Sequence, residues 1–431
     1  GAPEALGALL VRIDEPDDVI RQKVLASASR LRLALGAPPV SRAAVLGRID
    51  AELAEHVEVR DAYLAVRPLV VTQLLEEHMV RRLRKGLIRI LRLCELAYPR
   101  EVVASVRAHV FGADAALRAN AFEVLESLLD RRLRDRLVAA VELVLDLRAG
   151  RVPKPALSPR EAYAATGLAG EIASGDPWAA ALALDAIATR EIVAGGPEAL
   201  AAVASPEPLV REPAALAVAS LRPAGYERAL ERLLDDPDPT VRAFVRAWDA
   251  GGRARSIASE LMYSTIEKVL FLQRIPVFSR VAGEDLVGLA RGAAVVSFRK
   301  GDVIFRQGEP GGAMYFVITG RATLEVDGKP VFDLGPNEVF GELSIFDRGP
   351  RATSAVASAD AELLRVSSDD FHEAVRETVE IAEAVIQVLN RRLLEADRRL
   401  AAAGAPPPAT ATAAAERREL EARAADETDL E

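Results

Sequence analysis

Hydrophobic and polar positions follow two different patterns along the chain. From about residue 10 to residue 250, apolar residues recur at intervals of three and four, with little β-branched alternation. This spacing places an apolar stripe on one face of a helix and predicts a succession of α-helices. From Ala294 the pattern changes to short alternating stretches interrupted by glycine, as in VVSFRKGDVIFRQGEPGGAMYFVITG (295–320). This second pattern predicts short strands joined by turns.

The two patterns predict an α+β multidomain protein. The glycine-punctuated strands are typical of a small β-barrel or jelly roll, with helices on both sides of it in the sequence. The end of the chain is rich in alanine, proline and charge, which is typical of a disordered tail. The predicted parts are a helical region at 1–110, helical repeats at 111–255, a β-rich domain with flanking helices at 265–400, and the tail at 401–431.

Several predicted helices open with one phrase: an acidic or proline start, an apolar residue and then arginine. Acidic residues and proline suit a helix N-terminus, where the dipole favours negative charge and a missing N–H costs nothing. Arg118, Arg211 and Arg242 hold the equivalent place. Arg211 and Arg242 are 31 residues apart and Arg118 and Arg211 are 93 apart, which is three times that spacing. A fixed period of this size is typical of a stacked helical repeat.

This phrase resembles that of HEAT repeats, in which an aspartate early in one helix pair and an arginine in the next helix bridge adjacent units. The resemblance covers about 110–250, while between 10 and 110 only Arg21 keeps the phrase. It implies an α-solenoid that serves as a scaffold, because stacked helices present an extended surface to partners. An irregular helical domain is the alternative that the sequence leaves open.

A basic stretch, HMVRRLRKGLIRILRLCEL (78–96), has two interpretations. Its basic residues interleave with apolar ones, as they do in a helix that lies on a membrane surface or binds a partner. The simpler interpretation, which we favour, is a buried helix of the repeat region with one solvated basic face. The basic residues are Arg81, Arg82, Arg84, Lys85, Arg89 and Arg92.

Composition and charge narrow the classes of partner. The formal charge is −9, because 64 acidic residues outnumber 55 basic ones, so we expect no nucleic-acid partner. No stretch approaches the roughly 18 consecutive apolar residues of a membrane-spanning helix. The chain begins with Gly1 and has no signal segment, which we interpret as the start of an excised fragment or as a tag remnant.

The sequence also lacks the motifs of common enzymes. It has no glycine-rich loop followed by Lys-Ser/Thr, no nucleophile elbow and no kinase or cyclase signature, so we expect no catalytic residues. The single cysteine, Cys94, has no internal disulfide partner, and the four histidines are scattered without metal-ligand spacing. These features predict a cytoplasmic protein without a metal site.

One short segment, FGELSIFDRGPRATSAVAS (340–358), places an acid and a base among small residues. Gly341 to Phe346 is short enough to form a single helical turn, whose free amides favour an anion. Arg351, on the returning chain, can grip a phosphate bidentately. Glu342 can accept a hydrogen bond from a ribose hydroxyl. The segment therefore predicts a site for one ligand that carries both a phosphate and a ribose.

The pattern F-G-E-L followed by P-R-A strongly resembles the phosphate-binding cassette of cyclic-nucleotide-binding domains. This module is shared by regulatory subunits of cAMP-dependent kinase, the bacterial catabolite activator and cyclic-nucleotide-gated channels. The resemblance covers about 265–400, and it implies that Glu342 binds the ribose 2′-hydroxyl and Arg351 the cyclic phosphate. The further contacts that it implies are the backbone of Gly341, Leu343 and Ser344, with Ala352 and Thr353 lining the phosphate and base side.

The resemblance also bears on the base. In the family, a hydroxyl residue directly after the arginine favours cGMP. Ala352 stands there, so we expect cAMP as the ligand, with cGMP as the other candidate. The base-capping residue stays open among Asn390, Arg391, Leu393 and Leu394. The same closing helix could pack on the β-domain or form a dimer seam through Ile381, Val385, Val388, Leu389 and Leu393.

These features predict a regulatory module that senses a cyclic nucleotide and couples binding to a helical scaffold. A domain that has lost binding and serves as a scaffold is one alternative. Another is the cytoplasmic regulatory region of a bacterial membrane transporter, because such an order of parts resembles the soluble region of transporters similar to ATP/ADP exchangers. A transcription factor would need a helix-turn-helix after the long helix, whereas the chain after residue 401 is rich in alanine and proline and acidic. We expect a protein partner or a linked membrane domain to receive the signal.

Overall fold

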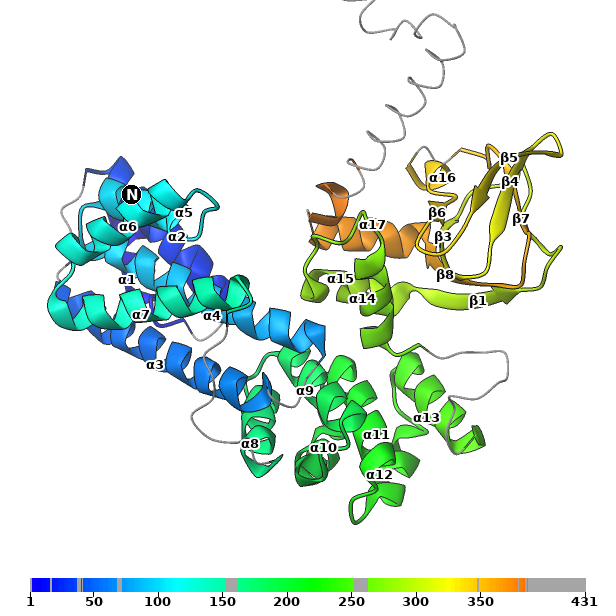
Figure 1. The fold of residues 1–431 in the computed structure, drawn as a ribbon, viewed down its shortest axis with the longest axis horizontal. Coiled ribbons are helices and arrows are strands. Elements are labelled where there is room, and N and C mark those ends of the chain that lie inside the picture. Colours follow the sequence, from blue (N-terminus) through cyan, green and yellow to red (C-terminus); the bar gives the residue numbers. More distant parts are fainter. Residues whose placement is uncertain are drawn as a thin grey trace, which may run out of the picture. The chain divides into compact units, whose positions relative to one another are not determined.

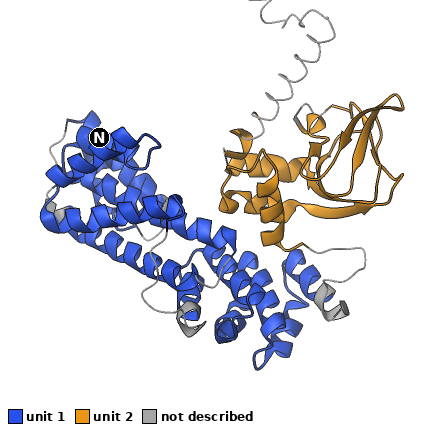
Figure 2. Ribbon diagram, viewed as in Figure 1, with its two compact units in different colours: residues 1–257 blue, residues 258–431 orange. Residues whose placement is uncertain are grey.

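The chain forms two compact units, residues 1–257 and 258–431, which Figure 2 shows in blue and orange. The computed structural model describes residues 2–15, 18–36, 40, 42–67, 72–151, 161–251, 263–346, 349–378, 380–383 and 386. Among these residues the first unit contains helices, and the second contains all the strands. The predicted change from helix to short strands is confirmed.

The helices of the first unit follow one another along the chain, as Figure 1 shows. They are α1 (Ala2–Val11), α2 (Asp18–Ala34), α3 (Arg42–Val66), α4 (Gln73–Ala97), α5 (Arg100–His109), α6 (Ala115–Leu128), α7 (Arg131–Arg148), α8 (Glu161–Ile172), α9 (Pro177–Thr189), α10 (Gly196–Ala202), α11 (Pro208–Leu221), α12 (Tyr226–Leu233) and α13 (Pro239–Gly251), with a 3₁₀ turn at Val193–Gly195.

Helix α4 lies at the centre of its neighbours. It packs against α2, α3, α5, α7 and α9, and leucines such as Leu83 and Leu87 are almost fully buried in it. Its basic residues reach inward as well: Arg89 Nε lies 2.8 Å from the buried carboxylate of Glu52. The favoured interpretation of 78–96 is confirmed in that the helix is buried among its neighbours, whereas its basic face is solvated only in part, because Arg84 and Lys85 are exposed and Arg89 is buried.

The arginines of the recurrent phrase share the same type of backbone contact. In each case Nη1 donates to the carbonyl oxygen six residues earlier, which ties the start of the helix to the preceding turn. The bonds are Arg21 to Glu15 (2.6 Å), Arg118 to Gly112 (2.7 Å), Arg211 to Ser205 (2.9 Å) and Arg242 to Asp236 (2.5 Å). The phrase is thus one local structural unit, whereas a HEAT solenoid for the whole region stays a prediction.

One of these arginines also links two successive phrases. Arg211 grips Asp236 with two hydrogen bonds, from Nε to Oδ2 at 2.7 Å and from Nη2 to Oδ1 at 2.8 Å. Both side chains are buried. This paired arrangement satisfies each charge with the other, as a buried ion pair requires.

The described elements of the second unit are α14 (Thr265–Arg274), α15 (Gly283–Gly292), β1 (Ala294–Phe298), β2 (Val303–Phe305), β3 (Ala313–Thr319), β4 (Ala322–Val326), β5 (Lys329–Leu334), β6 (Val339–Phe340), α16 (Leu343–Phe346), β7 (Ser354–Ala357), β8 (Ala361–Ser367) and α17 (Ser368–Glu377). Among these described elements, α14 and α15 precede the strands and α17 follows them.

The strands form two antiparallel sheets, with orders β1-β8-β3-β6 and β2-β7-β4-β5. Of the two arrangements that the sequence left open, a small β-barrel or a jelly roll, the barrel is wrong, because within the described strands no pairing joins the two sheets. The physical reason lies in two edge strands, β2 and β6, which have three and two residues. Strands this short are too small to continue a ladder from one sheet into the next. The observed pair of sheets is the arrangement of a jelly roll.

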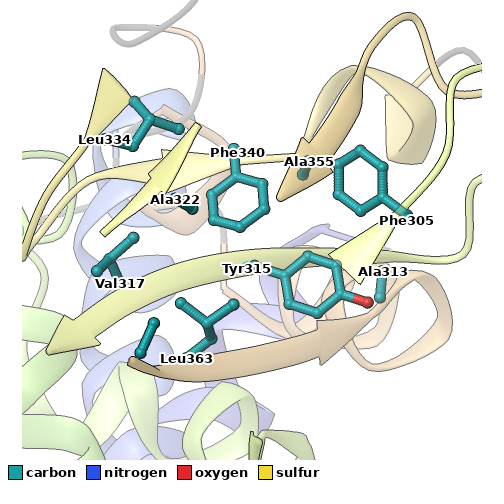
Figure 3. Close-up of a cluster of buried hydrophobic side chains, with 10 residues drawn as sticks. Phe305, Ala313, Tyr315, Val317, Ala322, Leu334, Phe340, Ala355 and Leu363 are labelled. Atoms are coloured by element: carbon teal, nitrogen blue, oxygen red, sulfur yellow. The ribbon is translucent and has the colours of Figure 1, made fainter. Parts of the chain in front are cut away.

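Strand β3 shows how the sheets are covered. Tyr315 and Val317 point into the core between the sheets, which Figure 3 shows. The alternate residue Phe316 is also buried, and its ring centre lies 5.9 Å from that of Phe278, which follows α14. One face of the strand thus packs on the other sheet and the other face contacts the turn between α14 and α15, so both faces are apolar.

Several predictions fall on other parts of the chain. The tail at 401–431, the base-capping candidates Asn390, Arg391, Leu393 and Leu394, and the seam residues Val385, Val388 and Leu389 lie outside the described residues. Of the predicted dimer seam, Ile381 is described, and its side chain is fully buried within its own chain. No helix among the described residues combines the length and apolar character that spanning a membrane requires.

Candidate functional site

The segment 340–358 begins at the end of β6 and turns sharply. Gly341 has φ +79°, a left-handed conformation that glycine adopts without strain. A Cβ at this position would lie 2.7 Å from Nη1 of Arg351, so the glycine also makes room for the guanidinium. The four residues of α16 follow directly. The predicted single helical turn is confirmed.

Arg351 reaches back under this turn, and only 6% of the residue is exposed. Its Nη1 donates to the carbonyl oxygen of Gly341 at 2.9 Å and to Oγ of Ser344 at 2.7 Å. Its Nη2 donates to the carbonyl oxygen of Ala313 on β3 at 2.7 Å. The arginine is therefore held from both ends of the site, by the turn after β6 and by the start of β3.

The partners of this buried cation are neutral. Within the described residues Arg351 has no carboxylate in ion-pair contact, and its buried Nε has no hydrogen-bond partner. Burial lowers the pKa of Arg351, with an opposing effect from Tyr315 and Glu309, while the positive charge of Arg365 lowers it further. A buried charge without a counter-ion is costly. The arrangement is therefore suited to an anion that arrives with a ligand.

Glu342 lies at the start of α16, and 5% of the residue is exposed. Its backbone carbonyl accepts a hydrogen bond from the amide of Ile345 at 2.9 Å, which fixes the turn. Its negative charge raises the pKa of Arg351, although less than the causes above. The acid and the base that the sequence singled out are thus both buried at one site.

Ser344 has a role that sequence reasoning missed. Its hydroxyl accepts the bond from Arg351 and donates to the carbonyl oxygen of Gly341 at 3.0 Å, so the side chain, beyond the predicted backbone contact, orients the guanidinium. Of the other predicted residues, Leu343 is 53% exposed, Ala352 is exposed and Thr353 is partly exposed. The first two contribute little buried side-chain surface.

The loop before β3 completes the site, and sequence reasoning also missed it. The amide of Arg351 donates to the carbonyl oxygen of Glu309, and the amide of Gly308 donates to that of Arg351, both at 2.8 Å. A Cβ on Gly311 would lie 2.1 Å from Cβ of Ser344. Only a glycine allows this approach between the loop and α16. The glycine pair in EPGGAM was the signal available in the sequence.

The aromatic side chains beneath Arg351 were not predicted either. The guanidinium carbon lies 4.1 Å from the centre of the Phe305 ring and 6.0 Å from that of Tyr315. Phe305, Tyr315 and Phe340 come together in the core between the sheets, as Figure 3 shows. The sequence predicted short apolar strands here, but it gave no indication of which charge these rings would contact.

Comparison with known families identifies the domain that holds this site. Residues 295–378, which include Glu342 and Arg351, match the model of the family described as "Cyclic nucleotide-binding domain". This part of the chain belongs to that family. The cyclic nucleotide-binding domain spans strands β1 to β8 and α17, and the helices of the first unit lie outside the match.

Three relatives share this domain. A "CRP-like cAMP-activated global transcriptional regulator" of Mycobacterium tuberculosis is 33% identical over 30% of this chain and 60% of its own length. A "Cyclic nucleotide-gated potassium channel" of Rhizobium etli is 31% identical over 26% of this chain and 31% of its own length. A "cAMP-dependent protein kinase regulatory subunit" of Aspergillus fumigatus is 32% identical over 23% and 25%. The chain thus spans less than two thirds of each relative.

Proposed function

We propose that the chain is a regulatory protein that binds a cyclic nucleotide, with cAMP preferred to cGMP, at the cassette formed by residues 341–353. The observation that carries this proposal is the buried guanidinium of Arg351, whose contacts among the described residues are to neutral oxygens. A cyclic phosphate carries one negative charge and would supply the missing counter-ion. The relatives whose names include cAMP or cyclic nucleotides support the same class of ligand.

Each residue of the cassette has a part in this proposal. Arg351 binds the cyclic phosphate, and Glu342 accepts a hydrogen bond from the ribose 2′-hydroxyl. The backbone of Gly341, Leu343 and Ser344 adds contacts to the ligand, while Ala352 and Thr353 line its phosphate and base side. Because Ala352 offers no hydroxyl to a guanine, the site favours adenine.

We also propose that ligand binding is coupled to the helical first unit. A ligand shifts a conformational equilibrium only if it binds the two states with different affinity, and a buried site under a short turn is suited to such a difference. The three relatives carry regulatory names for different kinds of protein, a transcription regulator, a channel and a kinase subunit. In this chain, the partner of the helical unit would be another protein or a linked membrane domain rather than nucleic acid, and the setting would be the cytoplasm. The chain itself would have no catalytic activity.

Calorimetric titration of the nucleotide-free chain with cAMP and then with cGMP tests the proposal. Mass spectrometry first confirms that no nucleotide has co-purified. We expect micromolar or tighter affinity for cAMP, weaker affinity for cGMP, and loss of cAMP binding in the Glu342→Ala variant. Absence of heat with both ligands, in folded and empty protein, would overturn the proposal and leave a scaffold that has lost the ligand.

A further inference from the structure

Five arginines gather around one glutamate where α2, α4 and α5 pack together. The arginine cluster consists of Arg30, Arg32, Arg92, Arg100 and Arg107, with Glu95 as the carboxylate. It lies in the first unit and has no part in the nucleotide site. Arg30 is exposed, and Arg92, Arg100 and Arg107 are partly exposed, so a molecule in solution can reach the cluster.

The carboxylate of Glu95 already has partners. Glu95 is 1% exposed, and its two oxygens accept bonds from Nε of Arg107 at 2.6 Å and from Oγ of Ser29 at 2.5 Å. Arg100 donates to the same serine hydroxyl at 3.1 Å, and not to the carboxylate. One arginine, Arg107, therefore forms an ion pair with Glu95. The other arginines of the cluster are not needed to neutralise this carboxylate.

Arg92 is the clearest case of a surplus cation. It has no hydrogen bond or ion pair to any described residue, and its Nε is buried from solvent. Arg32, 6% exposed, donates through Nη2 to the carbonyl oxygens of Glu95 and Tyr98, but its buried Nε also has no partner. Arg30 has a single long bond, 3.5 Å, to Oγ of Ser27. Unsatisfied buried donors of this kind call for an acceptor.

Like charges also act on one another in the cluster. Burial lowers the pKa of Arg92, and the charges of Arg107, Arg30 and Arg100 lower it further, against one opposing effect from Glu95. The chain as a whole carries a formal charge of −9. The cluster thus concentrates positive charge in an acidic protein, and helix packing keeps the arginines close although they repel one another. Such an arrangement is expected of an anion site.

We propose that the arginine cluster binds a phosphate group. Planar guanidinium groups with paired donors match the oxygens of a phosphate, and a dianion would neutralise two of the surplus charges. The phosphate could belong to a soluble molecule or to a lipid headgroup, and the experiment below separates these sources. This proposal does not depend on cyclic-nucleotide binding, because it concerns a different unit of the chain.

The test is titration of the full chain with inorganic pyrophosphate, with sodium chloride of equal ionic strength as the reference. Because Arg351 could attract the same anion, every protein in the series carries Arg351→Gln. We expect pyrophosphate to bind and to raise the unfolding midpoint by about 3 °C at ten times its dissociation constant. A parallel flotation assay compares vesicles that contain phosphatidic acid with vesicles of phosphatidylcholine.

Two variants and one control test whether the arginine cluster itself binds the phosphate. Arg92→Gln removes a side chain without hydrogen bonds, so it should fold, keep or raise the midpoint of the ligand-free protein, and weaken pyrophosphate binding at least tenfold. Arg30→Gln, at an exposed position, should also weaken binding. Arg131→Gln is the charge-matched control, since that side chain is 89% exposed on α7. Binding of pyrophosphate or of acidic vesicles that Arg92→Gln weakens supports the proposal and identifies the source. Binding of neither, or binding that Arg92→Gln and Arg131→Gln change equally, would overturn it.

Discussion

The guanidinium carbon of Arg351 lies 4.1 Å from the centre of the Phe305 ring. That ring lies in turn 5.8 Å from Tyr315 and 5.9 Å from Phe340, measured between ring centres. The negative face of an aromatic ring attracts a cation, and the attraction is stronger where water is excluded. The aromatic layer therefore holds Arg351 in the site while no anion is bound to it.

Replacing Phe305 with leucine should weaken cAMP binding by roughly five- to thirtyfold, because a cation–π contact away from solvent contributes about 1–2 kcal/mol. Calorimetric titration measures the change, after circular dichroism confirms that the variant is folded. Phe332→Leu, at a position that is 48% exposed on β5, is the matched control and should keep the affinity of the wild type. Equal affinity of Phe305→Leu and the wild type would show that the ring does not position the arginine.

Gly311 and Gly312 are adjacent in the sequence but differ in the space around them. A methyl group on Gly311 would collide with Ser344, whereas one on Gly312 would meet nothing within 4 Å. Gly311→Ala should therefore push α16 away from the loop, destabilise the domain by about 1–3 kcal/mol and weaken cAMP binding. Gly312→Ala should change neither quantity. Urea unfolding and calorimetry measure both, and equal behaviour of the two variants would contradict the predicted contact.

Asp236→Ala should strongly destabilise the first unit, because it leaves the buried Arg211 without its carboxylate. Breaking one side of a buried ion pair costs about 3–5 kcal/mol. The double variant Arg211→Met/Asp236→Leu removes both charges and should recover much of that loss. Asp235→Ala, at the exposed neighbouring position, should stay within about 0.5 kcal/mol of the wild type. Urea unfolding followed by helical signal tests this, and a double variant less stable than Asp236→Ala would refute the explanation.

Protonation of His56 should lower the free energy of unfolding in mild acid. Burial lowers its pKa to about 4, the positive charge of Arg60 adds to this effect, and the nearby backbone of Leu83 opposes it. Because the unfolded pKa is about 6.5, the unfolded chain binds the proton first, and stability falls as the pH falls from about 6.5 towards 4. Linkage gives a loss of about 2 kcal/mol between pH 7 and pH 5.

The His56→Gln variant should flatten this pH dependence. Unfolding midpoints in urea at pH 7, 6 and 5 provide the comparison, and the slope with pH is the quantity of interest, since the substitution can also change stability at every pH. His109→Gln, at the C-terminal end of α5, should show the same change of unfolding midpoint with pH as the wild type. A slope that persists in His56→Gln would assign the acid sensitivity to another group.

The parts of the site that the sequence predicted are those set by adjacent residues. The order F-G-E-L and P-R-A located Glu342 and Arg351, and the length from Gly341 to Phe346 was enough to predict one helical turn. The local phrase that contains Arg118, Arg211 and Arg242 likewise turned out to be one structural unit, because its defining bond spans six residues.

The parts that escaped prediction depend on contacts between distant segments. The ring of Phe305 meets Arg351 only when β2 pairs with β7, and Gly311 meets Ser344 only when the loop before β3 folds over α16. The two separate sheets depend on which short strands find partners, and alternation of side chains gives no information on that choice. The arginine cluster could not be predicted from the sequence for the same reason, since its members come from three helices.

The affinity of cAMP for the Arg351→Gln variant decides whether this buried arginine binds the ligand. The same nucleotide-free preparation and calorimetric protocol serve for the wild type and for Arg306→Gln, whose side chain is 69% exposed in the same domain. We expect Arg351→Gln to remove a charge-assisted contact of about 1.5–3 kcal/mol and to weaken binding by roughly ten- to a hundredfold, while Arg306→Gln binds like the wild type. Unchanged affinity of a folded Arg351→Gln protein would contradict the claim that this buried cation receives the ligand phosphate.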